Sequence, residues 1–405
     1  MSGRVLYRDA ALADGGSPSL RLGVSILVEG GRIAWLRPAD DEGPGASDRD
    51  VEVVDASGTT AVPGLVDAHG HLTMPGGAHW IERAGDPTER LVGYATANGD
   101  LASAAGVRWV RDVGAPTRPD PLDGRERALS LGIRDRWRDR ARSRDAVPYV
   151  RAAGTWVTRA GSLPPGLAVE AADADALLSA TLRQLDDGSD LVKLYLDGPD
   201  PAACPWSVAE LRRVVEAVHA RGARVTAHAG HLDGARAGAD AAVDALEHGF
   251  ELDADVAAMM AQNGVFLVST LAVLGSWQSF GRTTTLPRFS GKEGRAVIAR
   301  RREAAVAAVA LAHAAGVRIA TGTDFGGGST RANQLAWEVE SLVAAGLEPW
   351  QGLAAATVAG GDLLGEPEAG RIREGGPADF FLVHGDPLAD PAALWRVWKV
   401  AWRDG

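Results

Sequence analysis

Two histidines separated by one residue are the first feature of this sequence that could do chemistry. His69 and His71 follow the short apolar segment 64–67, which reads as a strand. In an extended chain, residues two apart point the same way, so both imidazoles can meet one metal ion. The pair alone is weak support for a metal site, and further ligands are needed.

Three more potential ligands come later in the chain. Each directly ends or follows a short apolar run, at the place where barrel enzymes keep their active sites: His228, His248 and Asp324. Singly, each could be an ordinary core or loop residue. Together they predict imidazoles and a carboxylate that converge on one site, which suits Zn²⁺ or another borderline divalent cation.

A lysine occupies an unexpected position in the apolar run 191–196. Alternation along this run predicts that the side chain of Lys193 faces inward. A bare buried ammonium is costly in free energy. Two interpretations follow: Lys193 forms a buried ion pair with a neighbouring carboxylate, or it is chemically altered and serves as an anionic ligand.

The elements that must position these residues alternate in type after Pro63. Short apolar runs that read as strands are separated by alanine-rich helical stretches, and there are eight such runs: 64–67, 108–112, 149–154, 191–196, 224–227, 245–248, 265–269 and 318–321. Eight strands alternating with helices over about 300 residues are what a (β/α)₈ barrel of the TIM type requires. A doubly wound α/β sheet would alternate in a similar way, so the count supports the barrel without proving it.

Both ends of the chain have a different character. Segments 24–28 and 33–36 flank a glycine turn and predict a hairpin, and 51–55 predicts a third strand. The tail returns to strands at 379–383 and 397–402. We therefore predict a small β-sandwich domain made of residues 1–62 together with 366–405, and a barrel made of residues 63–365.

Composition excludes several classes of protein. The 405 residues include 42 Lys and Arg against 53 Asp and Glu, so the net charge of −11 argues against nucleic acid or an anionic membrane as partner. No apolar stretch has the length of a membrane span, and the single Cys204 cannot form an internal disulfide. With no targeting segment in view, we expect a cytoplasmic homo-oligomer that acts on a small molecule.

The residues also carry a family resemblance. Segment 62–71, Val-Pro-Gly-Leu-Val-Asp-Ala-His-Gly-His, closely resembles the first-strand signature of the amidohydrolase superfamily. Later segments resemble, in order, strands of its imidazolonepropionase-like and Xaa-Pro dipeptidase-like branch: 107–112, 190–193, 226–229, 247–249 and 322–324. The closing segments 378–383 and 385–387 resemble the return of that family to its β-sandwich.

This resemblance implies a binuclear site. His69, His71 and Asp324 would hold the first metal, His228 and His248 the second, and N6-carboxylysine at Lys193 would bridge the two. The two divalent ions would be zinc, with Mn, Co or Fe as alternatives. A metal-bridging hydroxide would then cleave a C–N amide or peptide-like bond of a small molecule, with Asp324 as general base and then acid.

Some positions depart from the patterns of relatives. Deaminases of the superfamily carry His-x-x-Glu on the fifth strand, where this chain has His231, and the dipeptidase-like relatives often show Gly-Gly-His where this chain has 159–162. The rival interpretations are a lactonase or phosphotriesterase on the same metals, a mononuclear deaminase, and a catalytically inactive scaffold. All six candidate ligand positions are filled, which argues against the scaffold.

Several residues near predicted strand ends could contact the substrate. His231 either faces the substrate beside His228 or replaces it as the metal ligand; we favour His228 because it directly ends the strand. His79 lies in a glycine-rich loop after the first strand, and an arginine at a strand end could hold a substrate carboxylate bidentately. The remaining candidates for substrate contact are Tyr195, Arg111, Arg159 and Arg331.

Two further expectations concern the walls of the site. Tryptophans near predicted loops indicate an aromatic or bulky apolar pocket: Trp80, Trp156, Trp206 and Trp277. The polar segment 278–292 after the seventh strand predicts a loop that shapes specificity.

Overall fold

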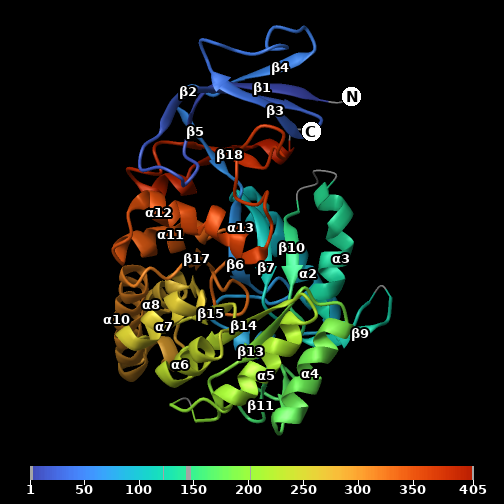
Figure 1. Ribbon diagram of the computed structural model, residues 1–405, viewed down its shortest axis with the longest axis vertical. Coiled ribbons are helices and arrows are strands. Elements are labelled where there is room, and N and C mark those ends of the chain that lie inside the picture. Colours follow the sequence, from blue (N-terminus) through green and yellow to red (C-terminus); the bar gives the residue numbers. More distant parts are fainter. Residues whose placement is uncertain (1–2, 122, 143–146, 201, 404–405) are drawn as a thin grey trace.

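The computed structural model describes residues 3–121, 123–142, 147–200 and 202–403, and it is an α/β fold with a small sheet at one end (Figure 1). All eight strands predicted after Pro63 are present within three residues of the expected bounds. They are β6 (Leu65–Gly70), β7 (Val107–Asp112), β10 (Tyr149–Ala152), β13 (Leu191–Tyr195), β14 (Arg224–Ala229), β15 (Ala245–His248), β16 (Phe266–Ser269) and β17 (Ile319–Thr321).

These strands pair in parallel and in chain order. One sheet has the order β10-β7-β6, and the other runs β12-β11-β13-β14-β15-β16-β17, with β11 (Val157–Arg159) and β12 (Val169–Ala171) at its edge. Single parallel bridges connect the two sheets, Ala153 with Leu191 and Gly70 with Phe325. The order does not reverse, whereas a doubly wound sheet reverses at its switch point. Among the described residues the ladders form two sheets and not one continuous barrel.

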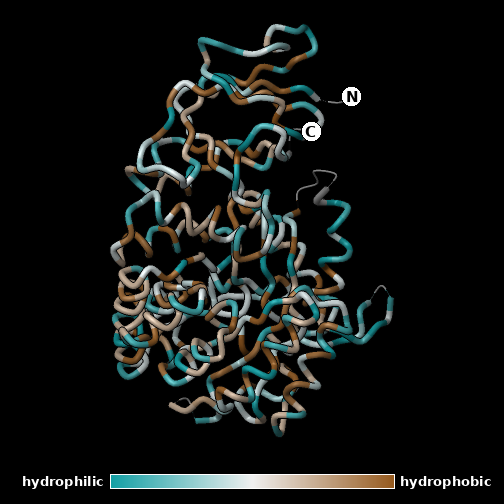
Figure 2. Tube along the Cα trace, in the orientation of Figure 1, coloured by the Kyte–Doolittle hydropathy of each residue, from teal (hydrophilic) through white to brown (hydrophobic). Residues whose placement is uncertain are grey.

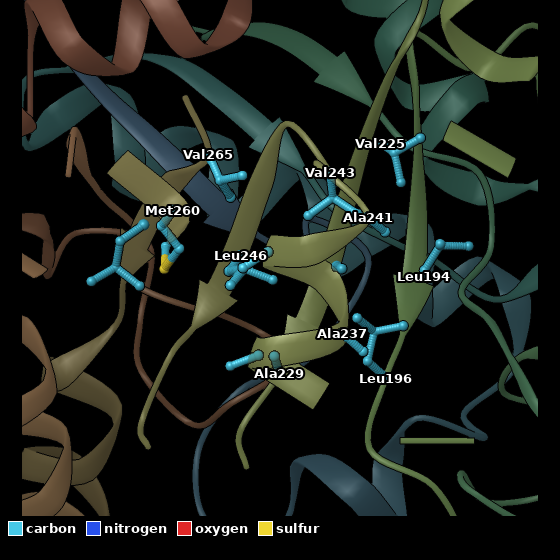
Figure 3. Packing of buried hydrophobic residues seen from close by; sticks show 14 of the residues in the cluster. Leu194, Leu196, Val225, Ala229, Ala237, Ala241, Val243, Leu246, Met260 and Val265 are labelled. Carbon is cyan, nitrogen blue, oxygen red and sulfur yellow. The ribbon is translucent and has the colours of Figure 1, made fainter. Parts of the chain in front are cut away.

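Strand alternation decides which side chains face the helices. Leu194 and Leu196 pack with Val225 and Ala229 into a buried cluster against α6 (Leu232–Asp240) and α7 (Ala254–Asn263), as Figure 3 shows. Successive side chains of a strand point to opposite faces, so Lys193 points away from this cluster. The same strands that build the core thus turn their polar residues to the other side.

Helices follow most of these strands and show ordinary end signals. In α5 (Val208–His219), Ser207 and Glu210 form a capping box. α7 begins after the capping carboxylate of Asp253 and ends at Gly264 with φ of 69°. The other helices are α1 (Trp80–Arg83), α2 (Thr88–Ala104), α3 (Leu129–Arg142), α4 (Ala174–Asp186), α8 (Leu271–Thr283), α9 (Pro287–Ser290), α10 (Lys292–Ala314), α11 (Leu335–Ala344), α12 (Pro349–Ala355) and α13 (Val358–Leu364).

The predicted loop at 278–292 is wrong in part. α8 continues to Thr283, and α9 covers 287–290. The apolar face that anchors α8 lies upstream, at Leu271 to Leu274, and is buried. Pro287 stands at the first turn of α9, where its fixed φ favours a helix. The polar composition of 278–292 therefore did not indicate these helices. The buried residues of α8 lie before this segment, and α9 is favoured by a single proline within it.

Strands from both ends of the chain build a separate sheet. Its order is β19-β18-β5-β1-β2-β3, and β4 branches from β1. Figure 1 shows the blue N-terminal strands beside the red strand β18 at one end of the molecule. The members are β1 (Arg4–Leu12), β2 (Arg21–Glu29), β3 (Arg32–Pro38), β4 (Val51–Asp55), β5 (Thr59–Pro63), β18 (Phe380–His384) and β19 (Val397–Val400).

The hydrogen bonds make this one branched sheet, because the first half of β1 pairs with β4 and its last residues pair with β5. The division of the chain into residues 1–62 with 366–405 and residues 63–365 stays a prediction. Residues 1–2 and 404–405 of that predicted small domain lie outside the described residues.

The remaining elements are small. β8 (Thr117–Pro119) and β9 (Glu126–Ala128) form a two-stranded ribbon, and η1 (Pro391–Trp395) and η2 (Ala401–Arg403) are 3-10 helices. In Figure 2, teal marks the loop that projects beside this ribbon and the outer loops of the terminal sheet. No helix in the described ranges is long and apolar enough to cross a bilayer.

Candidate active site

The six predicted metal ligands line one cavity of about 440 Å³ at the carboxyl ends of the parallel strands. β6, β14 and β15 carry histidines at or near their ends, β13 carries the lysine, and the aspartate follows β17. This is the end of the strands where barrel enzymes place their catalytic groups. The residues that meet there are His69, His71, Lys193, His228, His248 and Asp324.

Three of these ligands form a compact group. One ligand atom from each of His69, His71 and Asp324 lies within 4.8 Å of the others, and all three residues are buried. The carboxylate Oδ1 of Asp324 is 3.5 Å from Nε2 of His69 and 3.3 Å from Nε2 of His71. Asp324 has a left-handed φ of 50°, a costly conformation for a residue with a side chain, and such strain clusters at functional sites.

Each histidine of the group is held through one ring nitrogen. Nδ1 of His69 lies 2.6 Å from Oε2 of Glu247, and Nδ1 of His71 lies 2.8 Å from the carbonyl of Gly114. Nδ1 of His248 is 2.8 Å from Oγ1 of Thr270. A hydrogen bond at one nitrogen fixes the ring and its tautomer and leaves the other nitrogen for a cation.

His228 is held through Nε2, whereas the other three histidines are held through Nδ1. Its Nε2 lies 3.0 Å from Oδ2 of Asp197, which leaves Nδ1 as its free ring nitrogen. The ring is 4.5 Å from the ring of His248, centroid to centroid. His231 instead begins α6, and its Nδ1 lies 3.4 Å from Oε1 of Glu251. The geometry thus favours His228 over His231 as the partner ligand of His248.

Lys193 is buried without a partner. Its side chain is 1% exposed, and Nζ has no hydrogen-bond partner among the described residues. Glu247 and Asp324 attract its charge through space, but neither forms an ion pair with it in the described part of the chain. Burial lowers the pKa of Lys193 from 10.5 to about 8, against the attraction of Glu247. The interpretation of Lys193 as half of a buried ion pair is therefore not supported.

Arg111 lies behind the ligands and not in the cavity. Its guanidinium donates to Oε1 of Glu247 at 2.5 Å and to the carbonyl of Ala68 at 2.6 Å. Glu247 in turn holds His69, so Arg111 supports a ligand through one intermediary. The prediction that Arg111 contacts substrate needs correction, because Arg111 does not line the cavity. A side chain near the end of a strand can point toward the interior of the fold and still lie below the floor of the cavity.

Burial lowers the pKa of three histidines of the site, His69, His228 and His248, and so favours their neutral form. It lowers the pKa of His69 well below the usual value, with the charge of Lys193 adding to the effect. Burial and the neighbouring imidazole of His228 do the same for His248. The pKa of His228 is lowered less, since the Asp197 carboxylate opposes the effect of burial. A neutral imidazole is the form that binds a cation.

The predicted substrate contacts have different fates. Tyr195 and His231 line the cavity, and the Tyr195 ring stacks on His228 with centroids 4.0 Å apart. His79 is exposed at the start of α1 and does not line the cavity, whereas the next two residues, Trp80 and Ile81, do. The glycine-rich loop therefore contributes to the site, but through apolar side chains.

The tryptophans predicted for an apolar pocket mostly lie there. Trp80, Trp156 and Trp277 line the cavity, while Trp206 is buried in the core beside α5. Further apolar walls come from the segment after β11 and from α8: Leu163, Pro164, Leu167 and Val273. The cavity joins a polar ligand floor to largely apolar walls, which is typical of a small-molecule site.

Two polar residues of the cavity escaped the sequence interpretation. Asp197 lies four residues after Lys193 and two after Tyr195, so strand alternation alone could have placed it on the same side. Arg301 lies in the middle of α10, and nothing in its local sequence points to the site. The sequence signal for such a residue is weak because it depends on how the helix packs over the strand ends.

Comparison with known proteins identifies the family. The model of the family described as the amidohydrolase family matches residues 60–402. An uncharacterized protein of Mycobacterium tuberculosis is 31% identical over 252 residues, which are 61% of this chain and 66% of that protein. Ochratoxinase of Aspergillus niger is 29% identical over 231 residues, 53% of this chain and 46% of the enzyme. The aligned regions thus span just under two thirds and about half of these relatives.

Solved structures share the fold over almost the whole chain. A Xaa-Pro dipeptidase with methionine bound in its active site has a TM-score of 0.82 and 23% identity, with 98% of this chain and 97% of that chain covered. A prolidase complexed with N-methylphosphonate-L-proline has a TM-score of 0.81 and 20% identity, with 99% and 98% covered. The family match covers most of the chain and confirms the prediction made from residues 62–71: this protein belongs to the amidohydrolase family.

Proposed function

We propose that this protein is a binuclear metal-dependent hydrolase that cleaves a C–N amide or peptide-like bond of a small molecule. The observation that carries the proposal is the buried amine of Lys193, which has no hydrogen-bond partner among the described residues and lines the same cavity as the five other candidate ligands. An unmodified ammonium at this place is disfavoured by burial. Addition of the neutral amine to CO₂, with loss of one proton, would replace the cation by a carboxylate.

The donor set fits two divalent cations. The group of His69, His71 and Asp324 supplies one set of ligand atoms, and the free nitrogens of His228 and His248 supply another. A carboxylated Lys193 would supply two further oxygen ligands. Two cations bound there would polarise a substrate carbonyl and lower the pKa of a bound water, and zinc suits this mixture of nitrogen and oxygen ligands.

Asp324 is the residue that we propose moves the proton. Its carboxylate lies within 3.5 Å of both His69 and His71, at the edge of the cavity. It would take a proton from the attacking water and deliver it to the departing amine nitrogen, as base and then acid. The apolar walls, including Trp156 and Trp277, would exclude bulk water from the scissile bond.

The barrel architecture supports the same proposal. We propose that the eight parallel strands act as a (β/α)₈ unit, because single bridges span both gaps between the two sheets. Ligands from five different strand ends then share one cavity.

One observation favours a second candidate, a mononuclear enzyme. Of the described residues, only His69, His71 and Asp324 have ligand atoms that meet closely enough to form a cation site unaided. A one-metal deaminase would use these three and leave Lys193 unmodified. The two candidates differ in metal content and in the effect of removing the lysine amine.

The test is elemental analysis of the protein expressed with bicarbonate, as wild type and as Lys193→Ala. We expect two metals per chain in the wild type, and a loss of metal together with amide hydrolysis in the variant. Lys292→Ala, which removes an exposed lysine at the start of α10, is the control and should keep both. One metal per chain that persists in Lys193→Ala would overturn the binuclear proposal and favour the mononuclear candidate.

A further inference from the structure

An arginine that forms no ion pair with any described residue lies in the cavity wall, beside His228 and Asp197. Arg301 comes from α10, and its guanidinium carbon is 5.1 Å from the ring centre of Phe250, which also lines the cavity. Its Nε is shielded from solvent and has no hydrogen-bond partner among the described residues. A planar guanidinium held against an aromatic ring has less freedom to lose when it binds a ligand.

Gly230 lets this guanidinium approach the metal ligands. A Cβ atom at Gly230 would lie 2.7 Å from Nη2 of Arg301, 2.9 Å from Oδ2 of Asp197 and 3.7 Å from Nε2 of His228. These three groups therefore surround one point beside the second pair of histidines. Only a residue without a side chain leaves room for them there.

One oxygen of the carboxylate near this point is engaged, while Oδ1 of Asp197 is buried without a hydrogen-bond partner among the described residues. Oδ2 of Asp197 lies 3.0 Å from Nε2 of His228 and accepts a hydrogen bond from the amide of Gly230 at 3.0 Å. In the part of the chain that the structure describes, Arg301 has no carboxylate within 4.0 Å. A half-buried guanidinium that lines the cavity, and whose Nε has no partner among the described residues, is suited to bind an anion from outside.

We propose that Arg301 binds a carboxylate of the substrate. The site would therefore select amides that carry a free carboxylate a few bonds from the scissile carbonyl, together with an apolar group that packs on Trp156 and Trp277. The inference rests on the proposed hydrolase function, which places the scissile carbonyl over the ligand floor. The sequence suggested that Arg111, Arg159 or Arg331, near strand ends, binds a substrate carboxylate. We assign this role instead to Arg301, which lies on a helix.

Two ligands that cannot be hydrolysed test this assignment by binding alone. In 4-oxo-4-phenylbutanoic acid, a methylene group replaces the amide nitrogen of N-benzoylglycine, and in 1-phenylpentane-1,4-dione a methyl ketone also replaces the carboxylate. Calorimetry on the full-length protein as purified should show that the wild type prefers the acid. Arg301→Gln should bind the acid about 10- to 100-fold more weakly, which is the usual loss for a charge-assisted hydrogen bond. It should bind the dione as the wild type does.

Two more variants control for charge and for disturbance of the helix. Arg301→Lys keeps the charge but loses the bidentate geometry, so it should fall between the wild type and Arg301→Gln. Arg300→Ala removes the neighbouring exposed arginine and should leave both affinities unchanged. A wild type without preference for the acid, or an Arg301→Gln variant that keeps the preference, would overturn the assignment.

Hydrolysis of N-benzoylglycine, measured separately, distinguishes the two proposals. If the acid is preferred through Arg301 but no amide is hydrolysed, the carboxylate site stands and the hydrolase proposal fails. If amides are hydrolysed but Arg301→Gln binds the acid and the dione with wild-type affinities, the hydrolase proposal stands. The role of Arg301 in binding a carboxylate is then refuted.

Discussion

At the scale of single residues, the groups behind the ligands decide what the ligands can do. Asp197 and Glu247 each hold one imidazole through one ring nitrogen, and Arg111 holds Glu247. These contacts fix which nitrogen faces the cavity. Outer partners of this kind usually change metal affinity by 10- to 100-fold.

Asp197→Asn should weaken metal binding while the protein still folds. The amide keeps the size of the carboxylate but loses its charge, so His228 loses the partner that fixes its ring. We expect the affinity for the more weakly bound metal to fall about 10- to 100-fold, measured by competition with a chromophoric chelator. Asp200→Asn, at an exposed loop position, is the matched control. Equal metal affinities of Asp197→Asn and the wild type would show that Asp197 does not orient His228.

At the scale of elements, a buried carboxyl connects α11 to the seventh parallel strand. Glu338 accepts hydrogen bonds from Oγ of Ser269 at the end of β16, at 2.6 Å, and from the amide of Ala272 in α8, at 2.7 Å. Burial raises the pKa of Glu338 from 4.5 to about 7 although these hydrogen bonds oppose the shift. The protonated form is therefore the one that the fold favours.

This carboxyl makes stability depend on pH. The unfolded chain releases the proton at a pKa of 4.5 and the folded chain holds it to about 7, so the folded state binds more protons between these values. Its contribution is complete below pH 4.5 and is lost as the pH rises toward 7, on the order of 3 kcal/mol in total.

Glu338→Gln cannot ionise, so its free energy of unfolding should fall less than that of the wild type between pH 4.5 and 7. Denaturant unfolding of the chelator-treated protein at several pH values measures the difference. Glu303→Gln, which changes an exposed residue of α10, should retain the wild-type slope. A Glu338→Gln variant with that same slope would contradict the raised pKa.

Elements and ligands differed in how far the sequence could predict them. The eight parallel strands were predictable because apolar runs alternate with helical stretches, and the candidate ligands His69 and His228 because each lies at the end of such a run. The alternation of residues along a strand predicts which way a side chain points, but not how far it lies below the cavity floor. For this reason the sequence wrongly predicted that Arg111 contacts the substrate. Arg301 comes from a helix more than 50 residues after His248, and only the packing of α10 over the strand ends brings it to the site.

At the scale of the whole molecule, one buried arginine joins the terminal sheet to the parallel strands. Arg108 of β7 is 1% exposed, and its Nε donates to Oδ1 of Asp379, just before β18, at 2.8 Å. Its guanidinium also lies over the rings of Tyr149 and Trp402, 4.3 and 5.4 Å from their centres. This one side chain of β7 thus contacts Tyr149 of β10 and two C-terminal residues, Asp379 and Trp402.

Arg108→Met should destabilise the protein without changing its metal content. The substitution leaves the buried Asp379 without its partner, and breaking a buried pair commonly costs about 3–5 kcal/mol. Unfolding in denaturant measures this loss, and Arg108→Met combined with Asp379→Asn should recover part of it. Arg90→Met removes an exposed ion pair with Asp86 and should cost less than about 1 kcal/mol. A loss for Arg108→Met no larger than this would mean that the contact does not join the two regions.

The terminal sheet has a consequence for synthesis on the ribosome. β5 pairs with β18, which is encoded more than 300 residues later, and Gly70 at the end of the first parallel strand pairs with Phe325 after the last. During translation, the edge of β5 therefore stays without this neighbour until β18 has emerged. An unpaired strand edge invites pairing with other chains. On the nascent chain this edge is therefore open to pairing with other chains, and pairing with β18 ends that exposure.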